Sequence, residues 1–185
     1  MAPGLRKVVL AVHLTSSLGW VGAVLAYIAM GATAATSHDP QTVRAAWIAM
    51  ELAGWIVIVP LAVAALVTGL IISLGTSWGL FRHYWVLISL GLTLLATAIL
   101  LLHMPSVSGT ARIAREADPA QLMQLGGDLG HAIGGLVVLL AVTALNVFKP
   151  RGLTRYGWRK QQESRIPSTS RNLADNVPNP STPHL

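Results

Sequence analysis

The chain contains no cysteine, and only 11% of its residues are charged. Without cysteine it has no disulfide bond, no thiolate metal site and no cysteine nucleophile. It also lacks a glycine-rich phosphate loop after a strand, a His-Glu-x-x-His helix and a Gly-x-Ser-x-Gly turn. These absences exclude the familiar hydrolase and nucleotide-binding motifs. Any chemistry therefore depends on His, Met, Glu, Tyr or Trp.

Apolar residues, by contrast, are abundant: they make up 53% of the 185 residues, and the mean hydropathy is +0.59. A helix of about 20 apolar residues is long enough to cross the hydrocarbon core of a bilayer. Four runs of this kind occur, at about 8–31, 46–75, 83–104 and 129–148. The sequence therefore predicts an all-α, integral membrane four-helix bundle within residues 1–160.

The basic residues are divided unequally between the two predicted sides of the membrane. Ten of the 13 fall on the side of the termini, and three, Arg44, Arg112 and Arg115, fall on the other. Because cytoplasmic loops are enriched in Lys and Arg, both termini are predicted to be cytoplasmic. Residues 161–185 are polar and rich in proline, which predicts a disordered cytoplasmic tail. The basic residues follow a membrane span without a recognisable binding module, so no nucleic-acid partner is expected.

The two loops on the outer side are predicted at 32–45 and 105–128. In the second loop, Asp118 and Pro119 resemble a helix N-cap followed by proline at the first helical position, which predicts a short helix over 119–125. In the second span, Pro60 lacks a backbone N–H and is expected to kink the helix.

Histidine is the unusual residue of these apolar runs. His13 lies inside the first span, where an ionisable side chain is costly unless it has a role. Helical spacing places it on one face with Ser16, Ser17, Trp20 and Tyr27. This face is expected to point into the bundle and the aliphatic face toward lipid.

Because successive spans run in opposite directions, candidate ligands gather at two depths. The outer third is predicted to contain Met30, Met50, Glu51, His103, Met104 and His131. The inner third is predicted to contain His13 and His83. Two histidine pairs are therefore expected, His103 with His131 and His13 with His83. The glycines around His131 favour either close helix packing or space for a flat ligand.

Three functions are compatible with this pattern. In the first, the histidine pairs bind haem b, with Trp20 among the cofactor-binding residues, and the protein takes part in membrane electron transfer. In the second, His103, His131, Met50, Met104 and Glu51 handle copper, because thioether and imidazole groups bind Cu(I). In the third, the chain is a cofactor-free structural or accessory subunit. The expected partners are the bilayer and a larger membrane complex or a second copy of the chain.

Short motifs in residues 5–150 resemble those of small bacterial membrane families. The pattern of His13, Trp20 and Gly22 is similar to copper-resistance D-type proteins and HemJ-type protoporphyrinogen oxidases. The segments WGLFRHYWVL (78–87) and LLLHM (100–104) look most like a related group of uncharacterised integral membrane proteins. The resemblance implies a multi-pass protein of the bacterial inner membrane, and for the HemJ-type proteins it implies a haem-binding role for His13.

Overall fold

The computed structural model describes residues 2–75 and 83–149, together with residues 152, 154, 158, 159 and 162. This part of the chain is all-helical. Its elements are α1 (Pro3–Thr36), α2 (Pro40–Ala53), the π-helical turn η1 (Gly54–Ile58), α3 (Val59–Gly75), α4 (Tyr84–Glu116), α5 (Pro119–Leu122) and α6 (Gly130–Phe148). The predicted disordered tail, 161–185, lies outside the described residues apart from Gln162.

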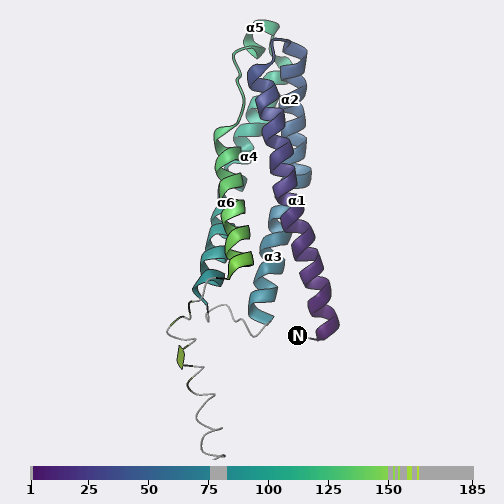
Figure 1. The fold of residues 1–185 in the computed structure, drawn as a ribbon. Helices are drawn as coiled ribbons and strands as arrows, with labels where there is room; N and C mark the ends of the chain where they lie inside the picture. Colours follow the sequence, from purple (N-terminus) through teal and green to yellow (C-terminus); the bar gives the residue numbers. More distant parts are fainter. Residues whose placement is uncertain are drawn as a thin grey trace, which may run out of the picture.

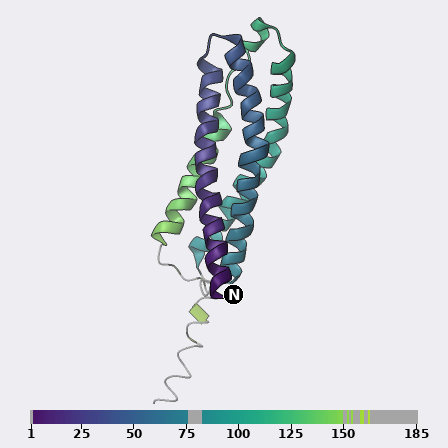
Figure 2. The ribbon, with the colours of Figure 1, turned by 90° about the vertical axis from the view of Figure 1, so that its right-hand side faces the viewer.

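Within the described residues, four segments are long and apolar enough to cross a membrane, the number of spans expected from the sequence. They are α1, the continuous segment Pro40–Gly75, α4 and α6. The helices form an elongated bundle in which α1 packs against α2 and α3, while α6 packs against α4 and α1 (Figure 1). Helix α5 lies at one end, here called the α5 end, and the N-terminus lies at the other (Figures 1 and 2).

The helices extend further at the α5 end than hydropathy predicts. Helix α1 continues to Thr36 instead of ending near residue 31, and α4 passes through Pro105 to Glu116 instead of ending at Met104. The predicted loops at 32–45 and 105–128 are therefore wrong in large part. The extension of α4 is amphipathic: Val107, Ala111 and Ala114 share one face and are at most 1% exposed. Packing of that face keeps the chain helical where the apolar run has ended.

Polar contacts hold the helix ends together at the α5 end. The guanidinium of Arg44 donates hydrogen bonds to the carbonyl oxygens of Ala114 (2.9 Å) and Ala117 (2.7 Å), beside the C-terminus of α4. Carbonyls in the last turn of a helix have no intrahelical donor, so this side chain satisfies them. Arg44 thereby ties α2 to the end of α4.

An aspartate ends each of the two short connections at this end and caps the helix that follows. Asp39 caps α2, and hydrogen bonds from the Thr42 side chain and from the backbone of Gln41 and Thr42 lower the pKa of its carboxyl group. Asp118 forms a capping box with Gln121 at the start of α5. The N-cap predicted at Asp118 is confirmed, although α5 ends at Leu122 and not at residue 125.

The turn η1 lies directly before Pro60. The N–H of Val59 donates to the carbonyl of Gly54, five residues earlier, so the backbone is locally widened where proline provides no donor. Gly54 also allows a close approach of α4, because a Cβ at this position would lie 2.5 Å from Cε of Met104. The widened turn and the glycine together bring α4 against the second span.

Candidate functional site

Two histidines and an aspartate converge where α6 begins. Ligand atoms of His103, Asp128 and His131 all lie within 4.8 Å of one another. Nε2 of His103 is 2.6 Å from Oδ2 of Asp128, and Nδ1 of His131 is 3.7 Å from Oδ1. The two imidazole rings are stacked, with centroids 3.9 Å apart and planes inclined by 19°. The structure thus brings together the two outer histidines and adds an acidic residue between them.

Helix α1 supplies a fourth member of the cluster. The hydroxyl of Tyr27 donates a hydrogen bond of 2.9 Å to Oδ2 of Asp128, the same oxygen that faces His103. Tyr27 is buried, as expected for the polar face of the first span. Asp128 therefore joins α1, α4 and α6 through a single carboxylate, and a carboxylate with two partners at short distance is strongly oriented.

The backbone that carries Asp128 is held against α1 and α2. A Cβ at Gly127 would overlap the carbonyl oxygen of Gly31, so α1 and this segment touch backbone to backbone. Gly126 has a φ of +58°, a conformation that glycine adopts readily. The indole N–H of Trp47 donates to the carbonyl of Gly126 at 3.2 Å. These contacts fix residues 126–128, and with them the position of the carboxylate.

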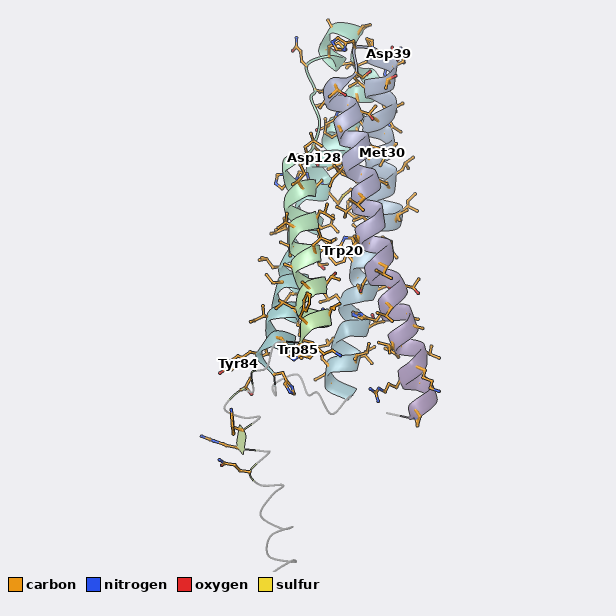
Figure 3. All side chains as sticks on the ribbon, viewed as in Figure 1. Trp20, Met30, Asp39, Tyr84, Trp85 and Asp128 are labelled. Carbon is orange, nitrogen blue, oxygen red and sulfur yellow. The ribbon has the colours of Figure 1, made fainter. Side chains whose placement is uncertain are left out.

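A largely apolar cavity of about 490 Å³ begins at the cluster and lies between α1, α4 and α6. Trp20, which lies further toward the N-terminal end of the bundle than Asp128 in Figure 3, forms part of its wall. Along α6 the wall contains Gly130, Gly134 and Gly135, and a Cβ at any of the three would meet no atom within 4 Å. Because these glycines have no side chain, the cavity is wider along α6. The polar groups of the cluster lie at one end of it.

The other expected outer ligands do not gather here. Glu51 forms an ion pair with Arg115. Met50 is fully buried and is absent from the cavity wall. Met104 lines the cavity, but its thioether packs on Gly54. Of the five residues predicted to handle copper, only His103, His131 and Met104 border the same space.

The inner histidines have different neighbours. Nδ1 of His13 lies 3.1 Å from the carbonyl oxygen of Ala65 and 3.0 Å from Oγ1 of Thr68, both on α3. His83 precedes α4, and its ring lies 6.3 Å from that of Trp85, centroid to centroid. His13 thus connects α1 to α3, and its pairing with His83 stays a prediction.

Sequence reasoning does not identify Asp128 as a site residue, because it places Asp128 at the end of the predicted loop 105–128. A signal was present: it is the acidic residue immediately before the fourth apolar run, and it lies three residues before His131, a spacing at which side chains share a helix face. Searches against protein-family models, curated proteins and solved structures give no match for this chain. Its function is therefore argued from the site.

Proposed function

We propose that the chain is a haem b-binding, redox-associated membrane protein whose cofactor occupies the cavity beside His131. The observation that carries this proposal is an apolar cavity that ends at two imidazoles. Imidazole is a common haem ligand, and helical bundles bind such cofactors between their helices. The resemblance of His13, Trp20 and Gly22 to HemJ-type proteins favours haem binding in general, while the histidine that it implicates, His13, lies outside the wall of this cavity.

The residues present fit a flat, apolar group. A volume of about 490 Å³ lies within the range of about 300–1,000 Å³ that is typical of cofactor and ligand pockets. The three glycines of α6 leave open space along one wall, as a planar ring requires. His131 would hold the metal, His103 lies beside it, and Trp20 would contact the ring. When bound, haem supplies one-electron redox chemistry.

The protein's own residues would orient the site and keep it dry. Trp20, Val24 and Leu139 are buried side chains of the cavity wall and exclude water. Asp128 holds the imidazole of His103 by a hydrogen bond. A second bond of this type to His131 would fix the protonated nitrogen of that ring as Nδ1.

The lengths of the helices support a particular placement of the bilayer along the bundle. The 19 residues of α6 span about 28 Å at 1.5 Å per residue, close to the roughly 30 Å hydrocarbon core. Helices α1 and α4 have 34 and 33 residues; the excess of α4 lies at the α5 end, whereas α1 extends past α6 at both ends (Figure 1). We place the α5 end outside the membrane, the cluster near the outer surface and both termini in the cytoplasm. Together with the family resemblance, this placement favours the bacterial inner membrane as the location of the protein.

Absorption spectra test the proposal directly. Protein purified in detergent from haem-replete cells is expected to show a Soret band and, after reduction, α and β bands. His131→Ala should remove most of the bound haem, because the other imidazole beside the cavity, that of His103, has its Nε2 bonded to Asp128. His38→Ala, in the connection before α2, is the matched control and should retain the wild-type spectrum. Lack of a Soret band in the wild type would refute the proposal.

A second candidate function is transition-metal handling, with copper as the first metal to test. It is favoured by the convergence of His103, Asp128 and His131 within 4.8 Å, since two imidazoles and a carboxylate suit first-row divalent ions. Haem-free protein should then bind about one equivalent of Cu²⁺, and Asp128→Asn should weaken binding by about 10-fold or more. Met50→Leu is the control, because Met50 lies outside the cavity wall. If neither cofactor binds, co-purification of a larger membrane partner would support the accessory role.

A further inference from the structure

We infer that, in the haem site proposed above, the iron has a single protein ligand, Nε2 of His131, and that its sixth position is open to a small exogenous ligand. In this arrangement Asp128 is a positioning residue and His103 stays bonded to it. The inference rests on the proposed function. It differs from the bis-histidine site expected from the sequence.

The first argument is the relative orientation of the rings. Two imidazoles that ligate one haem iron lie on opposite sides of the macrocycle and point toward each other. The rings of His103 and His131 instead lie face to face, 3.9 Å apart and nearly parallel. A macrocycle between them would have to separate two rings that are already in contact.

The second argument is that Nε2 of His103, the ring nitrogen that can approach a haem iron without Cβ crowding the macrocycle, is already bonded. It lies 2.6 Å from a carboxylate oxygen whose direction is fixed by the Tyr27 hydroxyl. The exposed fractions of the His103 and Asp128 side chains are 20% and 11%, so water replaces this contact poorly. Breaking a poorly solvated pair leaves a charged or polar group without a partner, which is unfavourable.

The third argument is that His131 has a free nitrogen on the side away from Asp128. Its Nδ1 is 3.7 Å from Oδ1 of Asp128, and among the described residues its Nε2 has no hydrogen-bond partner. Histidines that bind metals commonly donate their other N–H to a carboxylate. A small rotation of the His131 ring would shorten the distance between its Nδ1 and Oδ1 of Asp128 to that of a hydrogen bond. Nε2 would then remain free to bind the iron.

The lining of the cavity indicates the class of the sixth ligand. Away from the cluster it consists of aliphatic and aromatic side chains and glycine, including Val24, Leu100 and Val138. Apart from the indole N–H of Trp20, the described residues of this wall provide no side-chain donor and no charge to a bound anion, so it favours small neutral ligands such as carbon monoxide or nitric oxide.

The test compares spin state and ligand binding in four proteins purified with haem: the wild type, His103→Ala, His131→Gly and Asp128→Asn. The wild type is expected to be five-coordinate and high-spin, and carbon monoxide should shift its ferrous Soret band without displacing a protein ligand. His103→Ala should retain haem and remain high-spin. His131→Gly should lose haem, and added imidazole should restore binding. Asp128→Asn should lower the iron–histidine stretching frequency in resonance Raman spectra, an effect that a purely structural role would not produce.

The outcomes of this test distinguish failure of the inference from failure of the proposed haem-binding function. A six-coordinate, low-spin wild type that becomes high-spin in His103→Ala would overturn the inference and leave haem binding intact. Retention of the wild-type spectrum in His131→Gly without imidazole would also overturn it. Absence of haem from the wild type would refute the proposed function itself. If His131→Gly fails to fold, the His103→Ala spectrum still decides between one and two protein ligands.

Discussion

Replacement of Gly127 by alanine is expected to destabilise the fold by about 3 kcal/mol. The added Cβ would overlap the carbonyl oxygen of Gly31, and neither backbone can relieve the overlap by rotating a side chain. The segment before α6 would have to move away from α1, and Asp128 would leave Tyr27 and His103. The same variant is therefore expected to lose any ligand that depends on the cluster.

Unfolding in detergent, followed by circular dichroism, measures the change. The matched control is Gly91→Ala in α4, where a Cβ would meet no atom within 4 Å. Alanine in a helix interior is favoured over glycine by about 0.5–1 kcal/mol, so the control should be neutral or slightly more stable. Equal stability of Gly127→Ala and the wild type would show that the contact with Gly31 does not hold this segment in place.

Removal of the Asp128 carboxylate is expected to cost about 3 kcal/mol, because a poorly solvated hydrogen-bonding group left without its partner costs about 1–3 kcal/mol and two such groups are affected. Asp128→Ala leaves both the Tyr27 hydroxyl and the His103 imidazole without an acceptor. Tyr27→Phe removes one hydrogen bond and leaves the contact between His103 and Asp128 in place, so it should cost about 1 kcal/mol. The order of the two effects follows from the number of partners that each variant leaves unpaired.

A double-mutant cycle tests whether these residues act as one network. In an Asp128→Ala background, Tyr27→Phe should no longer destabilise the protein and should be neutral or slightly stabilising, because the bond is already lost and the buried hydroxyl lacks an acceptor. Reversible unfolding in mixed detergent micelles, monitored by tryptophan fluorescence, provides the free energies. An additive double variant would show that Tyr27 and Asp128 contribute independently and would contradict the hydrogen bond between them.

Much of the membrane architecture could be predicted from the sequence because hydropathy is a local property. The apolar runs ending at Gly75 and Phe148 match the ends of α3 and α6. Alternating span direction was enough to bring His103 and His131 to the same depth. The buried face of α1, with Trp20 and Tyr27, follows from helical spacing.

The sequence by itself thus determined four apolar helices, an interior face of α1 and the depth of the outer histidines. Only the tertiary structure decided that α4 continues to Glu116, that His103 and His131 stack, and that Asp128 lies between α1, α4 and α6. These features depend on contacts between distant segments: the packing of Ala111, the crossing of Gly127 over Gly31 and the bond from Tyr27. Hydropathy and helical spacing describe residues that are neighbours along the chain, whereas a site is formed by residues that are distant in the sequence and meet in the fold.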